Sequence, residues 1–367
     1  MKKISIYIFK TITFVLMFIL TFTILSYVHL SMIRSSDLKR QNKKLKSIEN
    51  KYKEYQANGY YDFSLDNYDN KKLNEVKILA SHNSYKKKGS IVGKLFVGLG
   101  DSFSEAKALN YSYNTLTKQL MDGIYSFELD LRYRRNNFEV THVPIVDNSS
   151  NVVSFKNGLK EIKTFLMHEE NSFPLIIILE IKNDYMWLDP FIKDIKEEEF
   201  IKLENLLKEE LGSYLYTPKD MIEGYSSLTE RINDKGWPKV SELKNKAMFV
   251  IHAGSYANNY LNLKENNEQI LFSATYKTNL NDNAPFIIHN NLDIDSINEL
   301  VNKNYIVRTR IGDTLNYSDE DVYKALKSNA QILTSDFTVA RSDLNEYYYI
   351  LDKYTIVGLN NDWNCKS

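Results

Sequence analysis

The chain has 367 residues, which is enough for one large domain or two ordinary ones. Its 47 basic residues balance its 47 acidic residues, so the overall charge gives no support for nucleic acid as a partner. The single cysteine, Cys365, excludes an internal disulfide and does not indicate the redox compartment.

Residues 1–33 are predicted to form a membrane anchor or a signal segment. The 23 residues from Thr11 to Ile33 contain no Asp, Glu, Lys or Arg, and about 20 apolar residues suffice for a helix to cross a bilayer. No small-residue cleavage site is evident, which favours an uncleaved anchor over a removed signal peptide. Six basic residues follow the span and three precede it, a distribution that alone would keep the C-terminal part inside the cell.

Residues 34–75 are predicted to form a polar, mainly basic stalk or linker. The sequence DLKRQNKKLKSIENKYKEYQ in this stretch has few apolar residues and no sustained heptad. A solvated spacer is the preferred interpretation, because a run of basic residues usually faces water. The alternative is a juxtamembrane segment that attracts anionic lipid.

Residues 76–367 are predicted to form one catalytic α/β domain. Eight apolar runs of strand length are found at 76–80, 124–131, 138–142, 174–182, 247–252, 285–289, 305–310 and 331–337. Helical patterns are found at 116–123, 155–170, 200–212, 293–304 and 318–329. This alternation predicts a (β/α)8 TIM-type barrel, regular or irregular, behind the N-terminal helix and stalk. Residues 224–238 are interpreted as a loop, and the polar stretch 258–283 as an insertion.

Polar side chains gather at the predicted C-terminal ends of these strands, where a (β/α)8 barrel places its reactive groups. Glu128 and Asp130 lie two residues apart in an apolar strand, so both carboxylates point to one face. Two buried acids on one face require a compensating cation or a reaction centre. Together with Asn83 and Glu180 they offer four oxygen ligands, a set that suits Ca²⁺ or Mg²⁺ better than zinc.

Two histidines and three basic residues complete the candidate site. His82 and His142 are candidates for proton transfer, although a single histidine at a strand end is more often structural. Lys182, Arg308 and Arg310 are candidates for binding an anion such as phosphate, and structural ion pairs are the alternative for the two arginines. A hard cation, two imidazoles and basic groups together indicate phosphodiester cleavage.

Three further features of the sequence bear on the site. Asp336 is a candidate to orient one imidazole from the eighth strand. His252 and His289 also end predicted strands and are interpreted as structural, because no charged partner lies beside them in the sequence. The apolar stretch 89–103 is interpreted as the start of the first barrel helix, with a lip that dips into a lipid surface as the alternative.

Five segments match, in order, the motifs of a known family: ILASHNSY (78–85), 109–133, FEVTHVPIVDNSSN (138–151), PLIIILEIK (174–182) and 305–337. On these segments the chain resembles the phosphatidylinositol-specific phospholipase C superfamily, specifically its calcium-dependent bacterial and fungal branch. The resemblance implies a catalytic role for two histidines and a Ca²⁺ site made of four residues: His82 and His142, and Asn83, Glu128, Asp130 and Glu180. It also implies that phosphatidylinositol, or a related inositol phospholipid, is cleaved to diacylglycerol and a cyclic inositol phosphate, which is then released or hydrolysed.

The chain departs from the family pattern at two places. Residues 148–151 read Asn-Ser-Ser-Asn where relatives often have a cysteine, so the resemblance does not extend to a family disulfide. The run TRIGD contains an additional Gly312, which weakens a role for Asp313.

The expected partners are a phospholipid membrane and its inositol phospholipid, and no protein partner is implied. Three carboxylates bind Ca²⁺ without special tuning at the near-millimolar concentration outside cells. This favours a membrane-anchored protein with an external catalytic domain, or a secreted protein, against the charge distribution around the span. The alternatives are a glycerophosphodiester phosphodiesterase, whose usual His-Arg-Gly start is replaced here by His82-Asn83-Ser84, and a catalytically silent, membrane-tethered lipid-binding module.

Overall fold

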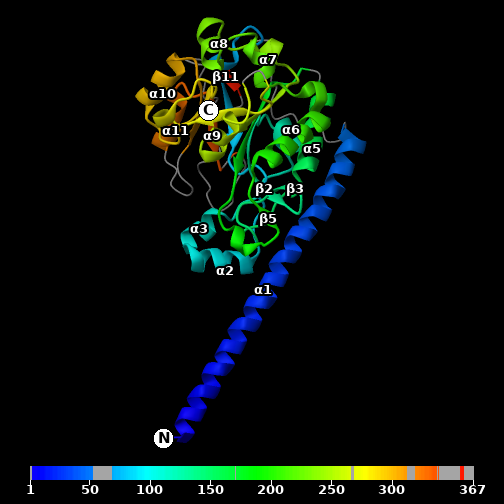
Figure 1. The fold of residues 1–367 in the computed structure, drawn as a ribbon, viewed down its shortest axis with the longest axis vertical. Coiled ribbons are helices and arrows are strands. Elements are labelled where there is room, and N and C mark those ends of the chain that lie inside the picture. Colours follow the sequence, from blue (N-terminus) through cyan, green and yellow to red (C-terminus); the bar gives the residue numbers. More distant parts are fainter. Residues whose placement is uncertain are drawn as a thin grey trace.

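The computed structural model describes residues 2–52, 68–169, 171–265, 268–311, 319–336, 338 and 356–358. Eight parallel strands close into a barrel, with helices around it (Figure 1). In chain order they are β1 (Val76–Ser81), β2 (Ser126–Arg134), β4 (Leu175–Ile181), β6 (Ala247–Ile251), β7 (Phe272–Thr275), β8 (Phe286–Ile288), β9 (Ile306–Arg310) and β10 (Ile332–Ser335). Each strand pairs with the next, and β10 pairs with β1. The predicted (β/α)8 barrel is confirmed.

The predicted strand at 138–142 does not belong to the barrel. It is β3 (Asn137–Val140), which pairs antiparallel with the end of β2 and forms a hairpin. Arg135 and Asn136 make the turn, and both have a positive φ, of 49° and 61°, as a tight two-residue hairpin requires. Two more short strands pair antiparallel with barrel strands: β5 (Ile192–Lys193) with β2, and β11 (Ile356–Gly358) with β1.

The fifth barrel strand, β7, lies in the stretch 258–283, so the interpretation of this stretch as an insertion is wrong. Helix α9 (Ser255–Leu261) ends there, and β7 follows with the sequence Phe-Ser-Ala-Thr, buried throughout. The predicted loop 224–238 also contains a helix, α8 (Leu228–Asp234), which begins where the Ser227 hydroxyl accepts a hydrogen bond from the Glu230 backbone N–H.

The five predicted helical patterns are confirmed as α4 (Leu116–Met121), α5 (Phe155–His168), α6 (Glu197–Leu211), α10 (Ile294–Asn302) and α11 (Asp319–Lys327). The other α-helices are α1 (Lys2–Lys51), α2 (Ile91–Gly100), α3 (Phe103–Ala108) and α7 (Pro218–Ile222). Short 3₁₀ helices are η3 (Leu73–Glu75), η4 (Met186–Leu188), η5 (Gly212–Tyr214), η6 (Val240–Glu242) and η7 (Lys277–Asn279). The core lies inside the barrel and between strands and helices, and the apolar strands β4 and β6 are buried on both faces.

Helix α1 is one continuous helix that leaves the barrel and projects far beyond it (Figure 1). Its N-terminal half is exposed, and α1 is the one helix among the described residues that is long and apolar enough to cross a membrane. Burial against the catalytic domain begins at Ser26 and Leu30, near the end of the charge-free stretch.

The C-terminal half of α1 packs on the catalytic domain through polar contacts. Gln41 exchanges two hydrogen bonds with the Ser154 backbone, at 2.8 and 2.9 Å. Arg34 forms an ion pair with Glu139, and the Tyr52 ring stacks on His168. Residues 34–52 are therefore not a solvated spacer, while residues 53–67 of the predicted stalk lie outside the described residues.

The apolar stretch 89–103 forms α2, which begins at the Ser90 cap and lies beside α1. The Phe96 ring stacks on Phe22 of α1, with centroids 6.4 Å apart. Ile91 and Leu99 nevertheless remain 83% and 69% exposed. The stretch is thus helical, as preferred, but it also presents an apolar surface beside the apolar half of α1.

Candidate active site

The predicted site residues converge at the C-terminal ends of β1, β2, β4, β9 and β10. His82 and Asn83 directly follow β1, and the sheet register pairs Asp130 of β2 with Glu180 of β4. Strand β2 continues past the barrel into the hairpin with β3, which explains why two acids lie in the middle of the strand and still belong to the rim. We call this cluster the rim site.

Glu128 is buried between Arg308 and His82. Its carboxylate forms an ion pair with Arg308, and its Oε1 lies 3.4 Å from His82 Nε2. Burial alone would raise the pKa of Glu128, but the charges of Arg308 and His82 outweigh it and lower this pKa to about 2. Arg308 also contacts Asn290 and donates to the Thr334 hydroxyl at 2.9 Å. The structural ion pair that was the alternative for Arg308 is present.

Asp130 is fully buried, and neither of its carboxylate oxygens has a hydrogen-bond partner among the described residues. The nearest cation is Lys182, whose Nζ lies 3.8 Å from Oδ2. Burial raises the pKa of Asp130 to about 6, and the charge of Lys182 opposes this shift without cancelling it. A buried carboxylate whose oxygens lack hydrogen bonds is the kind of group that a bound cation would stabilise.

Lys182 lies between two of the predicted metal ligands. Its Nζ is 2.6 Å from Glu180 Oε1 as well as 3.8 Å from Asp130. Burial lowers the pKa of Lys182, but the two carboxylates raise it by more than burial lowers it, so the ammonium form is strongly favoured. In the structure the ammonium of Lys182 thus compensates the charges of Glu180 and Asp130 at the position predicted for the metal.

Asn83 adopts the left-handed backbone conformation, with φ 48°, that asparagine tolerates better than most residues. Its side chain is buried, and its Oδ1 accepts a hydrogen bond from the Tyr85 hydroxyl at 3.1 Å. The turn is further fixed because the Ser84 backbone N–H donates to the Glu128 carbonyl at 2.9 Å. Asn83 is thereby held next to the strand that contributes Glu128 and Asp130.

Each of the two predicted catalytic histidines contacts a carboxylate through Nδ1. His82 Nδ1 lies 2.5 Å from Asp336 Oδ1, as predicted for Asp336, and Arg310 Nη2 lies 3.2 Å from the other oxygen of Asp336. Burial lowers the pKa of His82, but the negative charges of Asp336 and Glu128 outweigh it, so the pKa ends above its ordinary value. The imidazolium form of His82 is therefore favoured.

His142 is held by a partner that sequence reasoning did not identify. Its Nδ1 lies 2.9 Å from Asp147 Oδ2, and Asp147 also forms an ion pair with the fully buried Lys86. Burial would raise the pKa of Asp147, but Lys86 and His142 lower it to about 2. The signal in the sequence was the carboxylate five residues after His142, at a distance that a tight loop closes.

His252 also belongs to the rim site, so the interpretation of this residue as a structural histidine without a charged partner is wrong. A ring nitrogen of His252 and carboxylate oxygens of Glu128 and Glu180 all lie within 4.8 Å of one another. Position at the end of β6 was the only signal. His289, by contrast, makes local hydrogen bonds to Asn291 and Ser296, at 2.9 and 2.8 Å. Gly312 and Asp313 lie outside the described residues.

The donor set of the rim site fits a hard cation. Three carboxylates and an amide provide oxygen atoms, and Asp130 has two buried oxygens without hydrogen bonds. The cations Lys182 and Arg308 contact these same acids, so a bound metal ion would share or replace these contacts. The arrangement combines a cation site with two oriented imidazoles, as phosphodiester cleavage requires.

The chain is similar to known proteins in sequence and in fold. Residues 132–361, more than half of the chain, match the family model described as phosphoinositide phospholipase C, Ca²⁺-dependent. A comparison with curated proteins finds no match.

Two solved structures have the same fold. The calcium-dependent phosphoinositol-specific phospholipase C from Pseudomonas sp superposes with a TM-score of 0.57 at 15% identity, covering 80% of this chain and 97% of that one. The Ca²⁺-dependent phosphatidylinositol-specific phospholipase C from Streptomyces antibioticus gives a TM-score of 0.56 at 14% identity, covering 78% of this chain and 98% of that one.

Proposed function

The chain belongs to the Ca²⁺-dependent phosphoinositide phospholipase C family, and on this premise we propose that it cleaves phosphatidylinositol, or a related inositol phospholipid, to diacylglycerol and an inositol phosphate. The observation that supports this activity most is the rim site, where a buried carboxylate whose oxygens lack hydrogen bonds lies beside two imidazole–carboxylate pairs. The family match favours this reaction over glycerophosphodiester cleavage and over a silent lipid-binding module.

The predicted Ca²⁺ ligands are Asn83, Glu128, Asp130 and Glu180. When bound, Ca²⁺ supplies a Lewis acid that lowers the pKa of the attacking inositol hydroxyl and neutralises charge on the phosphate oxygens. The chain's contribution is to hold these four side chains on adjacent strands and to keep Asp130 away from water. His252 is close enough to Glu128 and Glu180 to join this set.

The two imidazoles have different surroundings and therefore suit different tasks. His82 is favoured as the imidazolium, a form that stabilises negative charge on the phosphate or donates a proton to it. His142 is oriented by Asp147, which leaves its Nε2 for proton transfer. Arg310 contacts both His82 and Asp336 and thus helps to position the His82 imidazole, in addition to its predicted role in binding phosphate.

The orientation of the barrel supports the proposal that the substrate lies in the membrane that α1 enters. In Figure 1, β2, β3, β5, α2 and α3 lie on the side of the barrel toward the N-terminal half of α1, while α7 and α8 lie at the opposite end. The rim site is at the C-terminal ends of the strands and so faces the same way as α2, whose exposed Ile91 and Leu99 suit contact with lipid. We place the catalytic domain outside the cell, anchored or secreted, because of the calcium requirement.

Product analysis on the full chain tests this function. The chain is mixed with phosphatidylinositol vesicles, with Ca²⁺ or with a chelator, and the phosphorus products are followed by ³¹P NMR. We expect diacylglycerol and a cyclic inositol phosphate with Ca²⁺, and no product with the chelator. His82→Ala and His142→Ala should each lower the rate by about 10² to 10⁴-fold, the usual contribution of a proton-transfer residue.

His289→Ala is the matched control, since this histidine also ends a barrel strand but among the described residues its ring makes only local hydrogen bonds. Its rate should stay within a factor of about 2 of the unmodified chain. Activity that survives complete chelation, or full activity in both His82→Ala and His142→Ala, would contradict the proposed reaction.

A further inference from the structure

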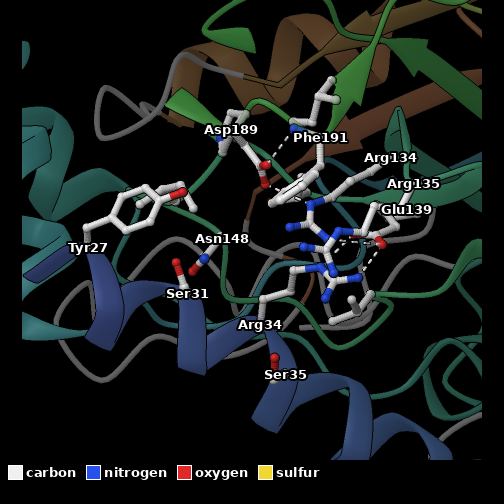
Figure 2. Close-up of a pocket in the computed structure, with 16 residues that line it drawn as sticks. Tyr27, Ser31, Arg34, Ser35, Arg134, Arg135, Glu139, Asn148, Asp189 and Phe191 are labelled. Atoms are coloured by element: carbon white, nitrogen blue, oxygen red, sulfur yellow. Dashed lines mark hydrogen bonds and ion pairs between the residues drawn. The ribbon is translucent and has the colours of Figure 1, made fainter. Parts of the chain in front are cut away.

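A cavity lies apart from the rim site, where α1 meets the catalytic domain. Its volume is about 260 Å³, and its wall is formed by α1, the β2–β3 hairpin and the segment that leads into β5 (Figure 2). None of the predicted catalytic or metal-binding residues contributes to this wall. We call it the α1 pocket.

Three arginines from two distant parts of the chain point into the α1 pocket (Figure 2). Arg34 comes from α1 and forms an ion pair with Glu139 of β3. Arg134 comes from the end of β2 and its Nε donates to Asp189 at 2.7 Å. Both carboxylates in the wall of the pocket are therefore occupied by an arginine.

Arg135 is different, because it forms no ion pair with any of the described residues. Its guanidinium lies over the Phe191 ring, with Cζ 3.8 Å from the ring centroid, and its backbone N–H donates to the Phe191 carbonyl at 3.1 Å. Stacking on an aromatic ring fixes the plane of a guanidinium and leaves its N–H groups available to another ligand. Three arginines and two acids in the wall thus leave one positive charge without a partner.

The remaining wall has the character of a site for an amphipathic anion. Ser31, Ser35 and Tyr27 contribute hydroxyl groups, which donate well to phosphate oxygens. Val140 and Ile145 add an apolar part, which suits the glycerol and acyl portion of a lipid. Arginine is the residue that binds phosphate most specifically, because its fork of N–H groups matches two phosphate oxygens.

The height of the α1 pocket along α1 matches the headgroup region of a bilayer. Tyr27 and Ser31 lie in the last two turns of the charge-free stretch that ends at Ile33, and Arg34 follows at once. That stretch of 23 residues is roughly 35 Å long at 1.5 Å per residue, slightly more than the hydrocarbon core. The end of the span, with a tyrosine and an arginine, is where lipid phosphates are found.

We propose that the α1 pocket binds the phosphate headgroup of an anionic phospholipid from the bilayer that α1 enters, as a structural lipid separate from the substrate. The lipid phosphate contacts Arg135 and Arg34, and the bound lipid joins the β2–β3 hairpin to the anchor. This inference requires the proposed membrane insertion of α1 but does not require catalysis.

Native mass spectrometry of the full chain in detergent tests the site. The chain is titrated with phosphatidylglycerol or with phosphatidylcholine of the same acyl chains, and the fraction with one bound lipid is measured. We expect phosphatidylglycerol to bind more tightly than phosphatidylcholine. Arg135→Gln should weaken phosphatidylglycerol about tenfold, the usual size of one charge-assisted hydrogen bond, and Arg135→Lys should lose less.

Lys39→Gln is the matched control, because Lys39 is an exposed cation of α1 that lies just after the span and outside the pocket wall. Its affinity for phosphatidylglycerol should change by less than about twofold. Equal losses in Lys39→Gln and Arg135→Gln would mean that only general surface charge attracts the lipid, and would overturn the proposal. Thermal unfolding of each variant, expected to be unchanged at the exposed Arg135, separates lost binding from lost folding.

Two further arms separate the sources of phosphate and the two proposals. Inorganic phosphate added with phosphatidylglycerol should not displace the lipid; displacement at millimolar concentration would make the α1 pocket a site for free phosphate and overturn the lipid assignment. Flotation of the full chain with vesicles tests membrane insertion independently. A chain that floats and cleaves phosphatidylinositol, but binds both lipids equally in every variant, would refute the pocket and leave the proposed function intact.

Discussion

The rim site and the α1 pocket are both clusters of acids and bases, but the least compensated charge has opposite sign in the two. At the rim it is Asp130, whose oxygens have no hydrogen-bond partner among the described residues and whose nearest cation, Lys182, is 3.8 Å away and closer to Glu180. In the α1 pocket both carboxylates are paired, and among the described residues the group without an ion pair is Arg135. The least compensated charge therefore points to a cation at one site and an anion at the other.

The two sites also differ in how much the least compensated charge costs. Asp130 is fully buried, so a poorly compensated charge there is expensive, and burial raises its pKa. Arg135 is exposed at the mouth of its pocket and is stabilised by water and by the Phe191 ring. A metal ion at the rim is consequently expected to have the larger energetic effect.

The largest expected effect comes from neutralising Asp130. Asp130→Asn keeps the shape of the side chain but removes the least compensated charge of the rim site, so we expect Ca²⁺ affinity to fall by about 100-fold or more and turnover to fall with it. Isothermal titration calorimetry measures the affinity, and hydrolysis of a soluble inositol phosphodiester measures turnover. Glu209→Gln, an exposed acid of α6, is the control and should change neither. Unchanged Ca²⁺ affinity in Asp130→Asn would show that this carboxylate does not bind the metal, and the contrast between the two sites would fail.

A smaller effect of opposite sign is expected at Lys182. Its ammonium contacts Glu180 and Asp130, so Lys182→Met removes a charge that competes with the metal and should raise Ca²⁺ affinity about fivefold. The same titration measures it, with Lys193→Met on β5 as an exposed control. If Lys182 instead binds the substrate phosphate, Ca²⁺ affinity will stay constant and KM for the soluble substrate will rise. That outcome would restore the role predicted from sequence.

The barrel was predictable because its longest strands are buried on both faces. A run such as Leu175–Ile181 is apolar along its whole length, which only a strand covered by helices requires. Strand β7 has only four residues, two of them hydroxyl-bearing, and so gives no such signal. The hairpin strand β3 was mistaken for a barrel strand because alternation alone does not show pairing direction. The Arg135-Asn136 turn was the missed evidence.

The docking of α1 was not predictable from hydrophobicity, because several of its buried contacts are polar. Asp37 accepts a hydrogen bond from the backbone N–H of Ser150, and Gln41 accepts one from that of Ser154, and both side chains are buried. The polar sequence of this half of α1 therefore predicts a solvated segment, although the segment is packed on the catalytic domain. At the rim site, the metal and histidine candidates followed from strand position. Asp147 and His252 did not, because their roles depend on loop closure and on neighbouring strands.

The smallest effect on turnover is expected at a buried acid outside both clusters. Glu161 of α5 is fully buried, and its Oε2 accepts a long hydrogen bond from the Thr117 backbone N–H at 3.4 Å. Burial raises the pKa of Glu161 from 4.5 to about 7, so this acid is compensated by a proton rather than by a cation. The folded chain then binds more protons than the unfolded chain between these two pH values, and stability falls as pH rises through this window.

Glu161→Gln mimics the protonated form and should remove this pH dependence. We expect the variant to be about 3 kcal/mol more stable than the unmodified chain at pH 8 and nearly equal to it at pH 4.5, with unchanged turnover. Denaturant unfolding of the full chain in detergent across this range measures the difference, with Glu209→Gln as the exposed control. Parallel stability curves for the Glu161 variant and the unmodified chain would show that burial does not raise this pKa. The buried carboxylate of Asp130 would then need no cation, because the same desolvation would be failing to disfavour a buried carboxylate elsewhere in the fold.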